Sequence, residues 1–185
     1  MQIVLASASP RRKELLSQIV SDFITDPATC GEEVNISLSP EDIAQGLAEQ
    51  KCEDVFLRHL SSVVIGCDTI VVYKGEILGK PKDAQDAIHT LKKLSGKTHC
   101  VITGVCVKSG NKKLVKYEKT EVRLNILSDE FIKEYVGGGS PLDKAGSYGI
   151  QDGGLVEQYF GSFTNVVGLP VELVGNMLKE IVSDL

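Results

Sequence analysis

A run of cations stands at the start of the first predicted helix, where positive charge is unfavourable. Ser9 suits the capping position, a proline suits the first helical position, and Arg11, Arg12 and a lysine follow. Each cation costs about 0.3–1 kcal/mol at the positive end of the helix dipole. A bound anion would reverse this penalty, because free backbone N–H groups, serine hydroxyls (Ser7 and Ser9) and two guanidinium groups would all point at it. Residues 7–12 therefore indicate a phosphate site, and the alternative is a solvated basic turn.

The second predicted helix begins with the same Ser-Pro pair but carries the opposite charges. Two acids, Glu41 and Asp42, follow Ser39 and Pro40, and they suit the positive end of the helix dipole. Everything at that helix start serves stability. Because a sequence that breaks a local rule often does so at a functional site, the contrast singles out residues 7–12.

A single carboxylate interrupts the most apolar segment of the chain. Asp68 lies within residues 63–72, which carry no other charge. A carboxylate in such a run is unfavourable unless it is paired, binds a metal ion or faces a cleft. Two interpretations are open at this point: Asp68 belongs to a site, or it marks a strand end or a bulge.

Other charged residues are less specific when each is taken alone. Glu32 and Glu33 in a polar loop are typical of a solvated acidic pair, and Lys51 extends a helix face as a surface lysine does. Lys80 lies between a glycine and a proline, a tight context that favours a positioned charge. His99 is a lone histidine beside a predicted strand, which favours a structural role.

Together these residues suit the hydrolysis of a phosphoric anhydride. Lysine and arginine neutralise phosphate charge, carboxylates hold Mg²⁺, and a carboxylate or the metal ion activates water for in-line attack. The chain lacks the Gly-x-x-x-x-Gly-Lys-Ser/Thr motif of P-loop enzymes and the Gly-x-Gly-x-x-Gly dinucleotide motif. It also lacks the Gly-x-Ser-x-Gly motif of serine hydrolases.

Length, composition and cysteine usage restrict the class of protein. The chain has 185 residues, 42% of them hydrophobic, and a net charge of −5, which suits one globular domain over 1–185 without a basic nucleic-acid-binding face. Apolar stretches are too short for the roughly 18 residues of a membrane span, and the first residues do not resemble a signal peptide. Five scattered cysteines favour a reducing compartment over a disulfide framework or a zinc site. We therefore expect a cytoplasmic protein that binds neither nucleic acid nor membrane.

The elements that must position these residues alternate between strands and helices, with hairpins among them. The predicted strands lie at 2–6, 23–25, 62–72, 76–78, 98–107, 113–124 and 155–160. The predicted helices lie at 11–20, 40–58, 83–94, 128–136 and 170–182, and residues 137–154 show no regular period. This order favours an α/β fold with a mixed sheet and helices packed on it.

The motifs, in this order and spacing, resemble those of the Maf family, within the superfamily that includes inosine triphosphate pyrophosphatases. The resemblance covers nearly the whole chain and rests on segments 5–16, 47–51, 66–69, 78–81, 94–99, 143–151 and 165–170. It implies a central mixed β-sheet flanked by helices, with two lobes around a cleft, and a homodimer. The implied activity cleaves a nucleoside triphosphate between its α and β phosphates, with a role in cleansing the nucleotide pool.

The resemblance also implies roles for individual residues. Asp68 falls on the catalytic base of the family. Arg11, Thr69 and Gln151 fall on the positions tied to substrate choice, and they match the branch that hydrolyses dTTP and UTP. The remaining matches are phosphate contacts and metal ligands: Ser7, Ser9, Arg12, Lys51 and Lys80 for the phosphates, and Glu33 with Asp68 for the metal. The implied cofactor is a divalent metal, Mg²⁺, with Mn²⁺ or another divalent ion as alternatives.

The sequence departs from the family motif at one position. Ser140 stands where the family usually has a glutamate, just before a proline and the Asp-Lys-Ala-Gly motif. A change there alters the affinity for substrate or metal if the glutamate supports a lysine or the metal.

Because the family is linked to septum formation and division arrest, one alternative function is a non-catalytic nucleotide sensor. The other is a pyrophosphatase for a different base, such as 7-methyl-GTP or ITP.

Overall fold

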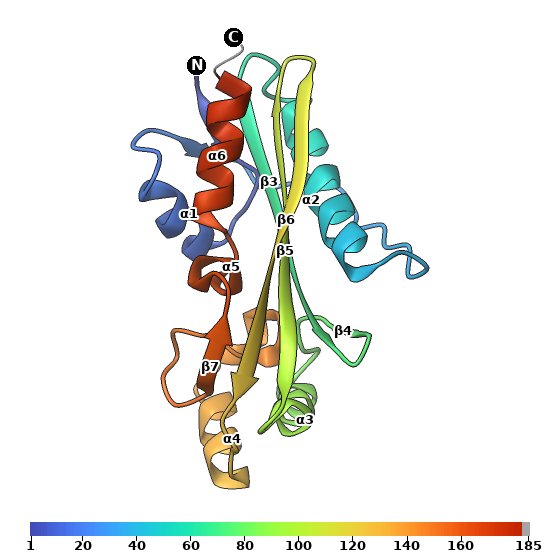
Figure 1. Ribbon diagram of the computed structural model, residues 1–185, viewed down its shortest axis with the longest axis vertical. Coiled ribbons are helices and arrows are strands. Elements are labelled where there is room, and N and C mark those ends of the chain that lie inside the picture. The colour runs from blue at the N-terminus through green and yellow to red at the C-terminus, as the bar shows by residue number, and fades with distance from the viewer. Residues whose placement is uncertain (183–185) are drawn as a thin grey trace. The chain divides into compact units, whose positions relative to one another are not determined.

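The fold is built on a mixed sheet with helices packed on it (Figure 1). The computed structural model describes residues 1–182 of the chain. Within them, the strands are β1 (Ile3–Leu5), β2 (Ile24–Thr25), β3 (Val63–Tyr73), β4 (Glu76–Leu78), β5 (Thr98–Ser109), β6 (Lys112–Leu124) and β7 (Val156–Phe160). The helices are α1 (Pro10–Ser17), α2 (Pro40–Phe56), α3 (Ala84–Leu94), α4 (Asp129–Gly137), α5 (Phe163–Val167) and α6 (Val171–Val182). The predicted α/β class is confirmed.

Parallel and antiparallel pairs coexist in the sheet, whose strand order is β2-β1-β3-β5-β6-β7 with β4 beside β3. β1 runs parallel to both β2 and β3, with Leu5 opposite Thr25 on one side and Ile65 on the other. β4 folds back on β3 as the predicted hairpin, and β7 is antiparallel to β6. Parallel pairing on both sides buries β1, which explains its short apolar sequence.

The two Ser-Pro helix starts form as their sequences predict. The Ser9 hydroxyl accepts the Arg12 N–H at 3.4 Å, and the Ser39 hydroxyl accepts the Asp42 N–H at 3.1 Å. The first helix ends at Ser17, so its predicted extension to residue 20 is wrong. Two apolar side chains of α1 are buried, but the next one, Ile19, is 41% exposed.

Short helical segments were missed by the sequence prediction. Residues 137–154 contain two 3₁₀ turns, Ser140–Asp143 and Ala145–Ser147. Helix α5 is only 5 residues long, and the Ser162 hydroxyl accepts the Asn165 N–H near its start at 3.2 Å. One turn of helix is too short to show a hydrophobic period, so such segments escape a periodicity test.

The described chain separates into two compact units. The first contains residues 1–68, 103–118 and those from 168 onward, and the second contains residues 69–102 and 119–167. The core of the first unit includes Val4, Ala6, Ala48, Cys52, Val55, Phe56, Val64 and Cys106. The core of the second includes Val71, Leu91, Leu94, Val101, Val122, Leu124, Ile132 and Leu155. No helix among residues 1–182 is long and apolar enough to cross a membrane.

Two strand glycines let α2 approach the sheet of the first unit closely. A Cβ atom on Gly66 of β3 would lie 2.3 Å from the Ala48 carbonyl oxygen. A Cβ atom on Gly104 of β5 would lie 2.1 Å from the Ala44 carbonyl oxygen. Both distances are far below van der Waals contact, so only glycine permits this packing. The close approach brings the C-terminal half of α2 near β3, where Asp68 lies.

His99 is a buried residue of the second unit, as its predicted structural role requires. His99 is only 2% exposed, and its Nε2 atom lies 2.7 Å from the Tyr148 hydroxyl. Burial lowers the pKa of His99 to about 4. The imidazole is therefore neutral in the folded protein at neutral pH.

We expect His99 to make the protein less stable as the pH falls from about 6.5 to about 4. In the unfolded chain the imidazole binds a proton near pH 6.5, whereas in the folded protein it does so only near pH 4. Protonation in this window therefore favours the unfolded state. At pH 5 the loss relative to pH 7.5 is about 2 kcal/mol.

The check is urea unfolding at pH 7.5 and pH 5 for the unaltered protein and for His99→Gln, which keeps a polar group but cannot titrate. The variant should lose about 2 kcal/mol less than the unaltered protein between the two pH values. Equal losses would show that His99 does not titrate as described.

Candidate active site

The segment at residues 7–12 connects β1 to α1 in the first unit. Ser7 is 8% exposed, and its hydroxyl accepts the Ser9 N–H at 3.2 Å. The Ser9 hydroxyl in turn caps α1 through the Arg12 N–H. The two serine side chains therefore shape the turn that begins the helix. Their predicted contacts with phosphate stay a prediction.

Arg12 ties this turn to two other parts of the first unit. Its Nε donates to the Gly168 carbonyl and its Nη1 to the Cys67 carbonyl, both at 2.8 Å. Nη1 also lies 3.5 Å from the Ser7 hydroxyl. Cys67 immediately precedes Asp68, so the guanidinium group holds the backbone beside the predicted catalytic base. The sequence indicated a cation at an anion site but did not indicate these backbone contacts.

Asp68 is paired with Lys51, which lies 17 residues earlier in the chain. The Lys51 Nζ contacts Asp68 Oδ1 and also lies 2.8 Å from Glu32 Oε1. The side chains of Lys51 and Asp68 are 17% and 12% exposed, whereas that of Glu32 is 56% exposed. Burial acts to lower the pKa of Lys51, but the carboxylates of Asp68 and Glu32 outweigh it and hold that pKa above its ordinary value. Lys51 thus stays charged at neutral pH and supplies the opposite charge beside Asp68.

This arrangement excludes a strand end at Asp68, whose role in a site stays a prediction, and it changes the interpretation of its neighbours. Asp68 lies inside β3 rather than at its end, and its charge is compensated. Lys51 is not the surface lysine that its position on a helix face suggests. The sequence interpretation of Glu32 was a solvated acid, and only the structure shows that its carboxylate contacts Lys51. The buried neighbour Cys67 is no nucleophile, because burial raises the pKa of its thiol to about 12.

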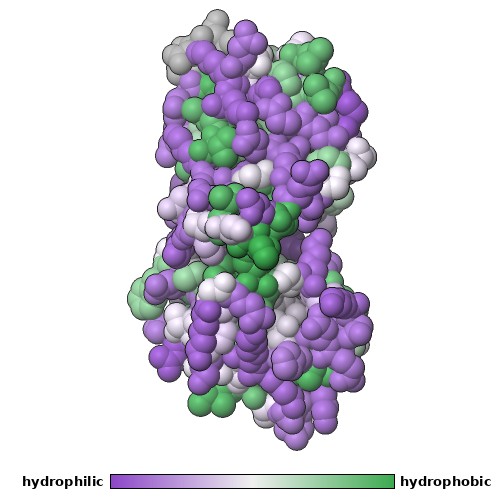
Figure 2. Space-filling view, turned by 90° about the vertical axis from the view of Figure 1, so that its right-hand side faces the viewer, coloured by the Kyte–Doolittle hydropathy of each residue, from purple (hydrophilic) through white to green (hydrophobic). Residues whose placement is uncertain are grey.

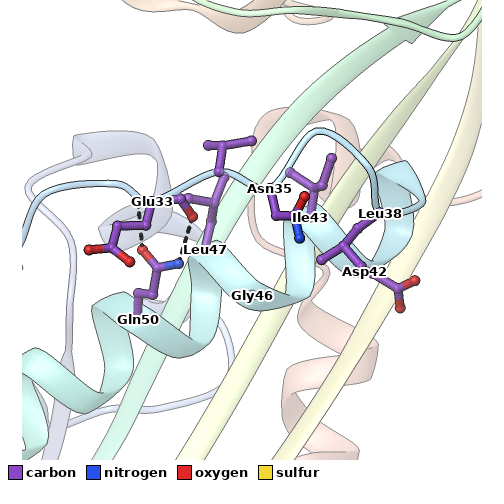
Figure 3. Close-up of a pocket in the computed structure, with 9 residues that line it drawn as sticks. Glu33, Asn35, Leu38, Asp42, Ile43, Gly46, Leu47 and Gln50 are labelled. Carbon is purple, nitrogen blue, oxygen red and sulfur yellow. Dashed lines mark hydrogen bonds between the residues drawn. The ribbon is translucent and has the colours of Figure 1, made fainter.

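Glu33 is attached to α2 by its backbone. Its N–H donates to Gln50 Oε1 at 3.0 Å, and Gln50 Nε2 donates to its carbonyl oxygen at 2.8 Å (Figure 3). The adjoining pocket has a volume of about 340 Å³ and is lined by Glu33, Val34, Asn35, Leu38, Asp42, Ile43, Gly46, Leu47 and Gln50. Two acids and no cation line it, so it does not suit a triphosphate. Figure 3 shows the Glu33 carboxylate directed away from Leu38 and Ile43.

The carboxylates around Lys51 fit a metal ion that is shared with a phosphate ligand. Among residues 1–182, no group of three or more histidine, cysteine, aspartate or glutamate side chains is arranged to hold a metal ion. Mg²⁺ does not need such a group, because it is commonly held by one or two carboxylates, substrate phosphates and water. Asp68 and Glu32 both contact Lys51 and supply two carboxylates of the kind that Mg²⁺ binds. The predicted metal contact of Glu33 stays a prediction.

Three further predicted site residues belong to the second unit: Thr69, Lys80 and Gln151. Thr69 follows Asp68 directly in β3. Lys80 follows the β3–β4 hairpin, where the Gly79 carbonyl accepts the Gly146 N–H at 3.1 Å. Gln151 is exposed and lies in a turn closed by a hydrogen bond of 3.0 Å from the Asp152 N–H to the Gly149 carbonyl. The roles of Arg11, Thr69 and Gln151 in substrate choice stay predictions.

Comparisons with known proteins agree with the sequence motifs. A family model described as "Maf-like protein" matches residues 2–181. A "dTTP/UTP pyrophosphatase" of Bacillus pumilus (strain SAFR-032) is 49% identical over 180 residues, which cover 96% of this chain and 95% of that protein. A protein of the same description from Aquifex aeolicus (strain VF5) is 44% identical over 183 residues, covering 98% and 96%.

A solved structure supports the fold independently of close sequence similarity. The Staphylococcus aureus Ham1 protein superposes with a TM-score of 0.54 at 15% identity, covering 98% of this chain and 100% of that chain. At this identity the likeness concerns the fold alone. It agrees with the predicted mixed sheet flanked by helices.

Proposed function

The chain belongs to the Maf-like protein family, and from this premise we propose that it hydrolyses dTTP and UTP to the nucleoside monophosphate and pyrophosphate. The observation that carries the proposal is the Lys51–Asp68 ion pair, which places a charged lysine against a nearly buried carboxylate within an apolar strand. Relatives described as dTTP/UTP pyrophosphatases are 44–49% identical over almost the whole chain, which supports the same substrates.

In the proposed mechanism Asp68 is the general base. Its carboxylate accepts a proton from water, and the water oxygen forms a bond to the α-phosphorus. The bond between phosphorus and the bridging oxygen breaks, and pyrophosphate leaves. A carboxylate takes a proton from water more readily when that water is polarised. A bound divalent cation, Mg²⁺ or alternatively Mn²⁺ or another divalent ion, would supply that polarisation when held by Asp68 with Glu32 or Glu33.

The cations of the chain have separate tasks in this proposal. The turn at residues 7–12 and the N-terminus of α1 bind phosphate oxygens, with Ser7, Ser9 and Arg12 as donors. When substrate binds, Lys51 pairs with phosphate oxygens as well as with its carboxylates. Lys80 provides a second lysine for the phosphates. Arg11, Thr69 and Gln151 select the base. We further propose that the protein is a single domain, works in the cytoplasm as a homodimer and binds neither nucleic acid nor membrane.

A panel of nucleoside triphosphates tests the proposed function. The purified protein with Mg²⁺ should release pyrophosphate and a monophosphate from dTTP and UTP, with less release from CTP and the purine triphosphates. Orthophosphate as the product would contradict the assigned cleavage. A preference for ITP or 7-methyl-GTP would reject the assigned base, and tight UTP binding without turnover in Mg²⁺ or Mn²⁺ would favour a sensor.

A further inference from the structure

A tyrosine hydroxyl joins the two ends of the turn that carries Gln151. The turn consists of residues 149–152 and is closed by the hydrogen bond from the Asp152 N–H to the Gly149 carbonyl, at 3.0 Å. The Tyr135 hydroxyl of α4 accepts the Gly149 N–H at 3.2 Å and donates to Asp152 Oδ2 at 2.6 Å. Both ends of the turn are therefore held by one atom of a helix outside it.

The same carboxylate oxygen collects two further groups. The Ser140 hydroxyl donates to Asp152 Oδ2 at 2.9 Å, and Lys144 Nζ lies 3.7 Å from that oxygen. Lys144 Nζ also donates to the Ser140 hydroxyl at 2.9 Å. Ser140 thus bridges the lysine to the aspartate, at the position where the family resemblance leads us to expect a glutamate. The Lys144 side chain is only 10% exposed, which limits its movement.

Protonation and packing both keep this network in one arrangement. Burial, followed by the hydrogen bond to Asp152, raises the pKa of Tyr135, so its phenol remains a donor at neutral pH. A Cβ atom on Gly149 would lie 2.8 Å from Asp152 Oδ2 and 3.0 Å from Lys144 Cε. The turn backbone therefore packs directly on the two charged side chains, and a Cβ atom at this position would require them to shift.

Gln151 has no comparable constraint of its own. It is exposed, so packing around its side chain does not determine its direction. A hydrogen-bonding side chain discriminates strongly only when its position is fixed. At this site the backbone of the turn is the part that is fixed.

We propose that Tyr135 and Asp152 are positioning residues for base selection, which hold the 149–152 turn so that the Gln151 amide meets a pyrimidine base in one orientation. The inference rests on the proposed function, in which Gln151 takes part in selecting the base. Ser140 and Lys144 support Asp152 in the same task.

The test compares kcat/KM for UTP with kcat/KM for CTP. We expect Tyr135→Phe, which removes only the hydroxyl, to lower the UTP/CTP ratio by about tenfold, because the turn then loses the hydrogen bonds at both ends. Ser140→Ala, a milder change, should lower the ratio by about two- to threefold. Tyr159→Phe is the matched control, since Tyr159 is 42% exposed on β7, and its ratio should not change. A general loss of folding would lower both activities together and leave the ratio constant.

A double variant separates this inference from the function on which it rests. In Gln151→Ala the ratio should fall, and adding Tyr135→Phe should then have little further effect on it, since Tyr135 acts through Gln151. A ratio that falls in Gln151→Ala but is unchanged in Tyr135→Phe overturns the positioning role and leaves the proposed function intact. Additive effects in the double variant also overturn it. Failure of the unaltered protein to release pyrophosphate from UTP overturns the proposed function and this inference together.

Discussion

Asp68→Asn is expected to lower kcat for UTP by about a thousandfold. Asparagine has nearly the same shape as aspartate, but its amide cannot accept a proton from water. The variant also loses the anion that Lys51 contacts, so the lysine is left with Glu32, whose side chain is 56% exposed. The measurement is pyrophosphate release under saturating UTP, with circular dichroism to show that the fold is retained.

Asp22→Asn is a suitable control for this change. Asp22 is an exposed aspartate of the same unit, outside the described contacts of Asp68, and its replacement should leave kcat within twofold of the unaltered value, roughly the scatter expected of surface substitutions. A drop of only a few-fold in Asp68→Asn would remove Asp68 from the role of general base. In that case the Lys51–Asp68 pair would be a structural ion pair, which is the alternative meaning of such a buried charge.

Arg12→Ala is expected to affect stability and activity together. The guanidinium group donates hydrogen bonds to the carbonyls of Cys67 and Gly168, and the methyl group of alanine can make neither of these bonds. Loss of these charged hydrogen bonds should lower the free energy of unfolding by about 2–4 kcal/mol. Because the Cys67 carbonyl adjoins Asp68 and the guanidinium is a proposed phosphate donor, kcat/KM for UTP should fall by at least about a hundredfold. Urea unfolding and steady-state kinetics measure the two effects.

The control for this prediction is an arginine in an exposed ion pair. Arg123 is 48% exposed and lies 2.7 Å from Glu157, so Arg123→Ala should cost no more than about 1 kcal/mol and leave kinetics unchanged. Arg12→Lys keeps the charge but loses the planar donor group, and it should restore only part of the stability. If Arg12→Ala is as stable and as active as Arg123→Ala, the two carbonyl contacts of Arg12 contribute to neither stability nor activity.

Local features of the fold were predictable because their causes lie within a few residues. The caps at Ser9 and Ser39 depend on hydroxyls three positions from the N–H groups that they accept. The β3–β4 hairpin follows from an apolar run with a Lys-Gly turn. The 3₁₀ turns at residues 140–147 and helix α5 were not predictable, because such short segments show no period. The hypothesis that Asp68 belongs to a site, which stays a prediction, also began locally, as a charge in an apolar run.

The sequence by itself determined the element order, the unusual charge at residues 7–12 and the motifs that place the chain in its family. Tertiary structure alone decided which side chains meet. Lys51 and Asp68 lie 17 residues apart, and they meet because two strand glycines let α2 approach the sheet. Tyr135, Ser140 and Lys144 converge on Asp152 through a network that no local spacing reveals. The physical reason is that ion pairs and buried hydrogen bonds depend on distance in space, whereas sequence patterns report only what neighbouring residues do to one another.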